Sequence, residues 1–263
     1  MPEDAQNRKR VVVLGAGFTG IRLFAELSGQ YDVSLTSRKG NPNGKGTPEN
    51  CIYFDLAVRQ SWQNALDADF VVWTFPAATE FSGIADALAL GEQLRLRKIP
   101  VAVLASTSCY MTQSPDQLVD ETFPLDESQP RVCAEEELRK SGCLVLALAG
   151  LYGTGRDPAG WLKRGLIKNA HSFINLIHVS DVVKIIRCWL EIPLSGIRLN
   201  VSDGRHRRWH ELAEQLVNCG TLQKESTHFL SDVPTVQSKR VNNSELVRQL
   251  YTGPFHAYPE DGL

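Results

Sequence analysis

Val11-Val12-Val13-Leu14-Gly15-Ala16-Gly17-Phe18-Thr19-Gly20 is the stretch that decides the fold, because an apolar run turns there through three glycines. Residues 11–14 predict a strand buried on both faces, and the apolar side chains of residues 18–27 recur with helical spacing. A Gly-x-Gly-x-x-Gly turn between a strand and a helix is typical of a dinucleotide site. The alternative is a glycine-rich turn without a ligand. The flanking strand and helix favour the dinucleotide.

Each glycine of this turn has a separate role in the predicted site. Gly15 permits the tight turn, Gly17 lets the backbone approach a pyrophosphate, and Gly20 lets the helix pack closely on the strand. The helix N-terminus, at Phe18 and Thr19, supplies N–H donors and a partial positive charge for an anion. We therefore expect these five residues to bind the cofactor.

Composition and charge bound the class of protein. The 263 residues carry a formal net charge of −2, which points neither to nucleic acid nor to an anionic membrane as a partner. No apolar stretch approaches the ~20 residues that span a bilayer. The six cysteines include no Cys-x-x-Cys pair, which favours reduced thiols and a cytoplasmic location. We expect a small-molecule substrate as the partner, and a homodimer stays open.

Strand-like and helix-like segments alternate over roughly the first 150 residues, and the pattern then becomes mixed. The expected strands are 11–14, 32–36, 51–54, 69–75, 101–105, 143–149, 173–177 and 197–201, and the expected helices are 18–27, 58–66, 80–96, 131–140, 161–167, 179–191, 209–217 and 244–250. This alternation predicts an α/β protein with a Rossmann-type doubly wound parallel sheet. Residues 1–155 should form the NAD(P)-binding domain, with the sheet completed by parts of 170–203. Residues 156–263 should form a small substrate-binding region interleaved with it.

The residues after the second predicted strand indicate which dinucleotide binds. In the NAD-binding pattern an acidic residue ends this strand and holds the ribose 2′-hydroxyl. Here the place reads Thr36-Ser37-Arg38-Lys39, with hydroxyls and two cations instead of a carboxylate. A 2′-phosphate would find partners in Ser37 and Arg38, so the sequence predicts NADP, with NAD as the weaker alternative. The competing interpretation is that both cations only solvate a loop.

Two further segments follow predicted strands at the edge where ligands of open α/β sheets bind. Asp55 and Leu56 come after the third strand, and Asp55 is expected either to contact the adenine end or to cap the next helix. Thr74, Phe75 and Pro76 leave the fourth strand. We expect all five to contact the cofactor, although a plain turn at residues 74–76 would look similar.

Six later segments complete a pattern along the chain, namely residues 106–110, 119–121, 150–156, 177–182, 200–204 and 239–243. With the glycine turn, and in this order, they resemble the extended short-chain dehydrogenase/reductase family, the sugar-nucleotide epimerases and dehydratases, and more closely its small atypical epimerase-like branch. The resemblance covers nearly the whole chain. It implies cofactor contacts at Leu151 and Tyr152 and substrate contacts at Arg156 and His178.

The chemistry of that family uses a Ser or Thr hydroxyl together with a Tyr-x-x-x-Lys pair. On the resemblance, Ser106 takes the hydroxyl position, Arg131 the Lys position and Glu127 the Tyr position, and no Tyr-x-x-x-Lys occurs in the chain. Arg131 can still bind ribose hydroxyls and supply a fixed positive charge, but it cannot carry a proton. Glu127 or Tyr110 would then carry it. Alternatively, Glu127 lies in a solvated loop and Arg131 only starts a helix.

The resemblance therefore implies an NAD(P)-dependent oxidoreductase or epimerase-type enzyme that moves a hydride to or from a small polar carbonyl or alcohol. Sugar nucleotides are the substrates that the family uses. The missing Tyr-x-x-x-Lys pair supports an alternative from another class, a non-catalytic NADP-binding sensor or scaffold.

Two other groups of polar residues are not assigned to the site. His206 and His210 lie four apart on a predicted helix, a spacing that can hold zinc, but the neighbouring arginines would repel a cation. No metal site is therefore predicted. Residues 135–137 are three consecutive glutamates, which we expect on an exposed helix face.

Overall fold

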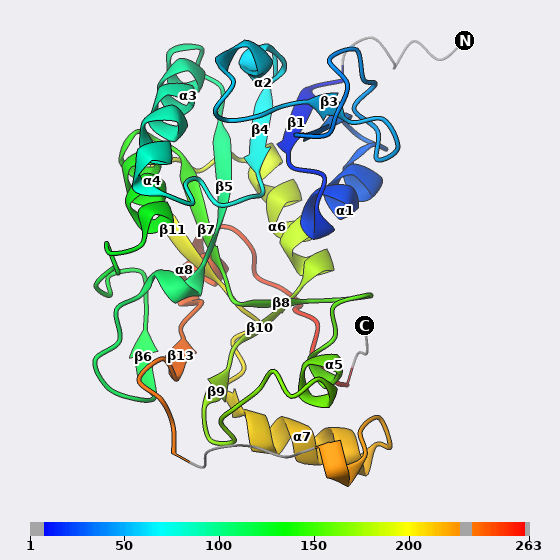
Figure 1. Cartoon of the computed structure of the whole chain (residues 1–263), viewed down its shortest axis with the longest axis vertical. Coiled ribbons are helices and arrows are strands. Elements are labelled where there is room, and N and C mark those ends of the chain that lie inside the picture. The colour runs from blue at the N-terminus through cyan, green and yellow to red at the C-terminus, as the bar shows by residue number, and fades with distance from the viewer. Residues whose placement is uncertain (1–7, 227–232, 261–263) are drawn as a thin grey trace. The chain divides into compact units, whose positions relative to one another are not determined.

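The computed structural model of the chain describes residues 8–226 and 233–260, and its central feature is a seven-stranded parallel sheet (Figure 1). The strands, in spatial order, are β3 (Ile52–Tyr53), β2 (Asp32–Ser37), β1 (Arg10–Leu14), β4 (Phe70–Trp73), β5 (Val101–Ser106), β7 (Leu144–Leu148) and β11 (Arg198–Val201). The chain moves outward from β1 in one direction and then in the other, so the switch point lies between β1 and β4. The predicted Rossmann-type doubly wound fold is confirmed.

β1 lies inside the sheet because it is apolar on both faces. Its Val11, Val12, Val13 and Leu14 are fully buried, and it pairs with β2 on one side and β4 on the other. Parallel strands covered on both faces read as continuous apolar runs, which is why this strand was predictable.

Helices cover both faces of the sheet, as Figure 1 shows, and five of them matter for the site. They are α1 (Phe18–Leu27), α2 (Gln63–Leu66), α3 (Ile84–Leu96), α4 (Pro130–Lys140) and α6 (Val179–Glu191). Helices α2, α3 and α4 share one apolar core with Val12 and Leu14 of β1. A Cβ at Gly91 of α3 would lie 2.4 Å from Leu138 of α4, so glycine allows these two helices to pack closely.

The opposite face of the sheet is covered by α1 and α6. Since successive strand residues point to opposite faces, Val13 faces these helices, whereas Val12 and Leu14 face α2 to α4. Val13 points towards α1, where a Cβ at Gly20 would lie 3.4 Å from its side chain. Phe70 of β4 packs edge-on against Trp189 of α6, with ring centroids 5.7 Å apart. Trp189 is fully buried.

The contacts divide the described chain into two compact units. The first contains residues 8–105, 126–147 and 183–198, and the second contains 106–125, 148–182, 199–226 and 233–260. The remaining strands and helices belong to the second unit: β6 (Gln117–Val119), β8 (Gly150–Tyr152), α5 (Pro158–Lys163), β9 (Phe173–Ile174), β10 (Leu176–His178), β12 (Arg207–Arg208), α7 (Trp209–Asn218), β13 (Lys239–Val241) and α8 (Ser244–Gln249). The division of function at residue 155 stays a prediction.

The second unit contains short strand pairs, and among their strands the sequence predicted only residues 173–177, which the structure divides into β9 and β10. β8 pairs with β10 and β6 with β13 in parallel, and β9 pairs with β12 antiparallel. Strands of two or three residues are too short to show alternation. The helix expected at 161–167 begins earlier, at Pro158, because the Asp157 carboxylate caps it by accepting the Ala159 N–H at 3.0 Å.

Two expectations about polar residues are wrong. His206 precedes β12 and is not helical, because Arg207 and Arg208 pair with β9 before α7 begins; the two histidines therefore do not share a helix face. Glu135 is not on an exposed face either, since its side chain is 1% exposed and follows the core residue Ala134. Among the described residues, no helix is both long and apolar enough to cross a membrane.

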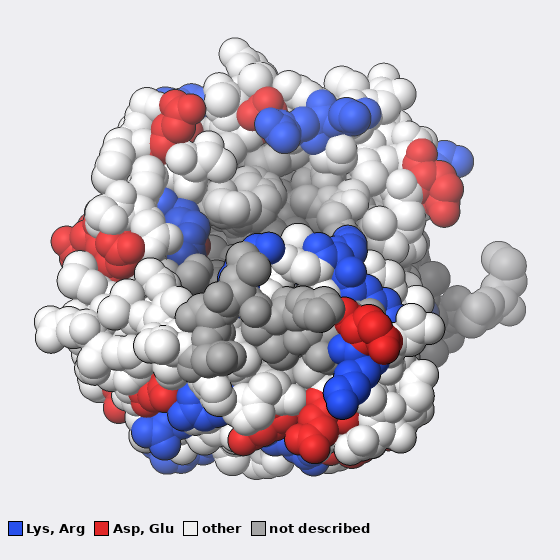
Figure 2. All heavy atoms as spheres, turned by 60° about the horizontal axis from the view of Figure 1, so that its bottom comes forward, with Lys and Arg blue, Asp and Glu red and all other residues white. Residues whose placement is uncertain are grey.

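The arginines around His206 have carboxylate partners within the second unit. Arg208 lies 2.8 Å from Asp116, Arg207 is paired with the buried Asp203, and Arg205 lies 3.4 Å from Glu260. On the face shown in Figure 2, basic and acidic side chains likewise lie interspersed in small groups.

Candidate functional site

Two threonines, one from each of the strands that flank β1, hold the glycine turn. Gly15 follows β1 with φ +109°, a conformation that favours glycine. Its N–H donates to Oγ1 of Thr36, at the end of β2, at 3.3 Å. Thr74, just beyond β4, donates from Oγ1 to the carbonyls of Leu14 at 2.9 Å and Gly15 at 3.1 Å. Thr74, a predicted cofactor contact, therefore supports the turn.

The other two glycines have different surroundings. A Cβ at Gly20 would lie 2.0 Å from the carbonyl oxygen of Gly15, so α1 can approach the turn only with glycine there. A Cβ at Gly17 would meet no atom of the described residues within 4 Å, and the backbone there is extended (φ −88°, ψ −163°). The space at Gly17 is open, as a pyrophosphate close to the backbone requires. α1 starts at Phe18 without a side-chain cap, and the N-terminus of a helix carries a partial positive charge that favours an anion.

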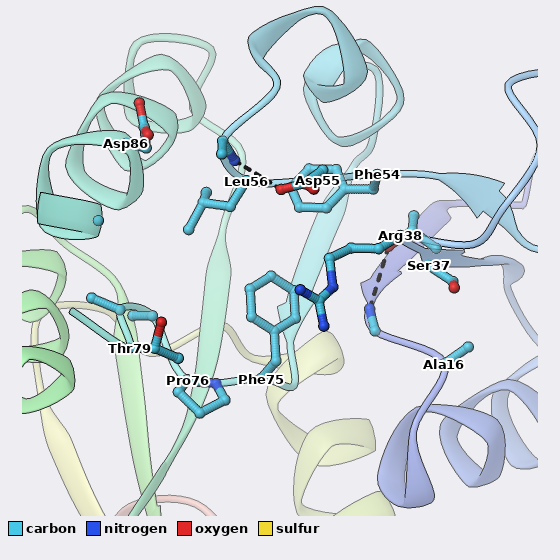
Figure 3. Close-up of a pocket in the computed structure, with 16 residues that line it drawn as sticks. Ala16, Ser37, Arg38, Phe54, Asp55, Leu56, Phe75, Pro76, Thr79 and Asp86 are labelled. Carbon is cyan, nitrogen blue, oxygen red and sulfur yellow. Dashed lines mark hydrogen bonds between the residues drawn. The ribbon is translucent and has the colours of Figure 1, made fainter.

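A cavity of about 470 Å³ opens beside this turn, at the carboxyl ends of β1, β2 and β4 (Figure 3). Predicted cofactor residues that line it are Gly15, Ser37, Arg38, Asp55, Leu56, Phe75 and Pro76. The sequence did not assign the other lining residues: Ala16, Thr36, Phe54, Ala57, Ala77, Ala78, Thr79, Gly83 and Asp86. Five further predicted residues, Gly17, Phe18, Thr19, Gly20 and Thr74, belong to the turn and its support and are not among the lining residues.

The cavity combines apolar walls with one cation. The rings of Phe54 and Phe75 lie with centroids 6.3 Å apart, and Leu56 lines the same space. Figure 3 shows the Arg38 side chain extending from the end of β2 into the cavity, with its guanidinium on the Phe75 side. Asp86, on α3, also lines the cavity and is paired with Arg59 at 3.6 Å. An aromatic base with a nearby phosphate matches these walls and this cation.

Asp55 holds a tight turn at the rim of the cavity. Its Oδ1 accepts the Ala57 N–H at 3.0 Å, while its own N–H donates to Oγ of Ser61 at 2.9 Å. The following 3₁₀ helix η2 (Arg59–Trp62) has Val58 at its N-cap and no side-chain cap. Asp55 therefore does not cap that helix, and its contact with the adenine end stays a prediction.

Arg131 lies in the first turn of α4, beside a buried carboxylate. Its Nη2 donates to Oε1 of Gln129 at 2.8 Å, and its Nη1 lies 3.5 and 3.4 Å from the two carboxylate oxygens of Glu135. Burial raises the pKa of Glu135 to about 7, and the positive charges of Arg131 and Arg198 offset only part of that effect. The sequence analysis did not identify Glu135, because its burial depends on how segments that are distant in sequence pack together.

Glu135→Gln is expected to change how stability depends on pH. Because the pKa of Glu135 in the folded protein lies above its ordinary value of 4.5, the folded state binds more protons between about pH 4.5 and 7. The contribution of Glu135 to the free energy of unfolding is therefore full at low pH and falls as pH rises through this window. The free energy of unfolding of the variant minus that of the wild type should therefore increase as pH rises from 5 to 8, measured by urea unfolding.

Glu136→Gln is the matched control on the same helix. Hydrogen bonds and charges of Arg139 and Arg198 lower the pKa of Glu136 despite its partial burial. The stability it contributes is therefore present above its ordinary pKa and is lost only as pH falls below it. Between pH 5 and 8 its difference from wild type should stay constant. A constant difference for Glu135→Gln as well would contradict the assignment.

The other predicted catalytic residues lie in different environments. Ser106 ends β5, where its Oγ accepts the Ser108 N–H at 3.2 Å. Tyr110 is buried and its hydroxyl donates to Oδ1 of the buried Asn200 at 2.6 Å, a contact typical of a structural tyrosine. Glu127 is exposed in the turn before α4. Their catalytic roles stay predictions.

Tyr152 and His178 face each other within the second unit, on the paired strands β8 and β10. Their ring centroids lie 4.9 Å apart, and both side chains are buried. His178 also stacks on His256, whose backbone N and ring Nδ1 each lie 2.7 Å from the buried Asp181 carboxylate. The sequence offered no signal for His256.

Leu151 and Arg156 flank this cluster along the chain. Leu151 is half-buried in β8, and Arg156 is exposed in the turn that follows. Their predicted cofactor and substrate contacts stay predictions. Within residues 8–226 and 233–260, no group of three or more His, Cys, Asp or Glu side chains is arranged to hold a metal ion.

Comparisons with known proteins agree on the fold. No family model matches the chain. Protein YeeZ of Escherichia coli is 26% identical over an alignment of 272 positions, which covers 96% of this chain and 97% of that protein. The structure of UDP-glucose 4-epimerase from Thermotoga maritima with UDP-glucose matches with a TM-score of 0.74 and 15% identity, over 96% of each chain.

A second solved structure, dTDP-glucose 4,6-dehydratase from Bacillus anthracis in complex with NAD, matches with a TM-score of 0.72 and 14% identity. It covers 97% of this chain and 94% of the dehydratase. The chain thus has the fold of NAD-dependent epimerases and dehydratases. The resemblance seen in the sequence is confirmed at the level of the fold.

Proposed function

We propose that this protein binds NADP(H) and is an oxidoreductase or epimerase-type enzyme acting on a small polar, anionic carbonyl or alcohol. The observation that carries the proposal is the cavity next to the open glycine turn, which Arg38 enters from the end of β2. A cation and the Ser37 hydroxyl stand where NAD-binding sites place a carboxylate. The location we propose is the cytoplasm, in keeping with six free cysteines.

The residues of the glycine turn, the Arg38 cavity and Arg131 would bind the cofactor. When bound, its nicotinamide supplies a hydride acceptor or donor. Ser106 would hydrogen-bond the reacting oxygen, and the Arg131 guanidinium would contact ribose and stabilise developing negative charge. Arg131 cannot carry the proton at neutral pH, so Glu127, water or the substrate itself would do so.

A second candidate function is a non-catalytic NADP-binding sensor or scaffold. The absence of Tyr-x-x-x-Lys from the sequence favours it, and so does the buried hydrogen bond of the Tyr110 hydroxyl to Asn200. The two functions share the cofactor site and differ only in turnover.

One experiment separates them. NADPH and NADH are titrated by fluorescence, and the cofactor-loaded protein is then assayed against sugar nucleotides and small hydroxy and keto acids. NADPH binding with turnover supports the enzyme, and binding without turnover on the whole panel supports the sensor. Failure to bind either dinucleotide would overturn both.

On a substrate found in that panel, Ser106→Ala should lower kcat roughly 100-fold while NADPH affinity stays within twofold, because its hydroxyl would act on the reacting oxygen. Ser108→Ala is the matched control, since its Oγ lies only 3.0 Å from that of Ser106. Equal rates for both variants and the wild type would remove Ser106 from the mechanism.

A further inference from the structure

Glu135 is a buried carboxylate for which the proposed chemistry gives no role. Its side chain is 1% exposed, and the nearest cation is Arg131, at 3.4 Å. The positive charge of Arg198 also acts on it. A carboxylate inside a protein is costly unless it is paired, and removing its partner is more costly still. The buried Glu135 carboxylate therefore keeps the Arg131 guanidinium close to it.

The first turn of α4 lies at the edge of the sheet that carries the cofactor cavity. α4 leads directly into β7, which is parallel to the other strands, so the helix starts at the edge where the strands end. α3 packs beside α4 through Gly91 and Leu138, and the segment at the start of α3 contributes Gly83 and Asp86 to the cavity. Arg131 thus belongs to the same ligand-binding edge of the first unit.

Gln129 and Glu135 both contact the guanidinium of Arg131. Nη2 donates to Gln129, which is itself anchored because its Nε2 donates to Asp126 at 2.6 Å. Nη1 faces both oxygens of Glu135. A planar guanidinium bound at two nitrogens has its plane fixed, which a lysine ammonium in its place would not. The cost of aligning it is then met before a ligand arrives.

Building on the proposed function, we propose that Glu135 is a positioning residue: its buried carboxylate aligns the Arg131 guanidinium for the ribose of NADP(H). Glu135 need not touch the cofactor. Its neighbour Glu136 has a different task, because its oxygens bind Arg139 at 2.7 Å and Arg198 at 3.0 Å. The two adjacent glutamates therefore allow a matched comparison.

The test is a double-mutant cycle read as the Kd of NADPH by fluorescence, with folding checked by thermal unfolding. Arg131→Ala should weaken binding roughly tenfold, since it removes a charged hydrogen-bond donor, and Glu135→Gln should weaken it roughly threefold to tenfold. The double variant should bind as weakly as Arg131→Ala alone, because Glu135 acts only through Arg131. Glu136→Gln should bind like wild type.

The affinity for NADPH is also measured as a function of pH, because a purely structural role of Glu135 would not change its pH dependence. The charged and titratable groups around Glu135 are Arg131, Arg198 and Glu136, and the arginines keep their charge across the series. Because the 2′-phosphate of NADPH itself gains a proton at about pH 6, the readout is the ratio of the wild-type and Glu135→Gln affinities. This ratio should fall towards one as pH drops below about 7. If that variant does not fold, Glu135→Asp keeps the charge, shortens its reach and should weaken binding to a similar extent.

Several results would overturn the assignment. Losses that add in the double variant, or Arg131→Ala binding NADPH like wild type, would show that Glu135 positions nothing for the cofactor. If Glu136→Gln weakened NADPH binding as much as Glu135→Gln does, Glu135 would only contribute to the stability of α4. Absence of NADPH binding by the wild type is a different result, which would overturn the proposed function itself.

Discussion

Gly17→Val is expected to abolish NADP(H) binding while leaving the fold intact. Within the part of the chain that the structure describes, a Cβ at Gly17 meets no atom within 4 Å, and the extended backbone there accepts a β-branched residue. The added side chain would therefore occupy only the space that the pyrophosphate needs. We expect an affinity loss of roughly 100-fold or more, which corresponds to about 3 kcal/mol. Fluorescence titration measures the affinity, and thermal unfolding checks the fold.

Gly29→Val is the matched control for this variant. Gly29 lies just beyond the other end of α1, and a Cβ there also meets nothing within 4 Å. The same substitution should leave NADPH affinity unchanged at Gly29. A folded Gly17→Val protein that binds NADPH like wild type would remove the glycine turn from the cofactor site.

The strands of the sheet and the glycine turn were predictable because their signals are local. β1 is a continuous apolar run, and the three glycines stand at fixed distances from it. Even so, the structure shows what spacing alone does not. Close contacts inside the protein require glycine at positions 15 and 20, whereas no contact among the described residues excludes a Cβ at position 17.

The walls of the cavity were only partly predictable, because they depend on contacts between distant segments. Thr79 reaches the cavity from the segment between β4 and α3, and Asp86 from the first turn of α3, and no residue pattern there marks a ligand contact. Glu135 is a stronger case. Three successive glutamates read as a solvated surface, yet the side chain of the first is buried, beside Arg131 one helical turn away and under the positive charge of Arg198, which is distant in sequence.

Arg38→Ala is expected to lower NADP(H) affinity by roughly 10-fold to 100-fold and to leave NAD(H) affinity nearly unchanged. Arg38 is the one cation among the residues that line the described cavity, and a charge-assisted hydrogen bond to a phosphate is worth about 1.5–3 kcal/mol. NAD(H) carries a hydroxyl in place of the 2′-phosphate and loses little. Calorimetric titration of both dinucleotides measures the difference.

Lys39→Ala separates a specific contact from the general field of two neighbouring cations. Lys39 follows Arg38 directly, carries the same charge and is likewise exposed, but it is not among the residues that line the cavity. If Arg38 binds the 2′-phosphate, Lys39→Ala should change NADP(H) affinity by less than about threefold, as expected for a screened surface charge.

The same pair of variants also decides how the dinucleotide is selected. Adenosine 2′,5′-bisphosphate carries the discriminating phosphate without the nicotinamide half, so its affinity should follow Arg38 as that of NADP(H) does. Equal losses in Arg38→Ala and Lys39→Ala would mean that net charge alone attracts the ligand. Equal losses of NAD(H) and NADP(H) in Arg38→Ala would place the guanidinium on the part of the cofactor that both share. Only a loss confined to the 2′-phosphate ligands, and to Arg38, makes this residue the one that selects NADP.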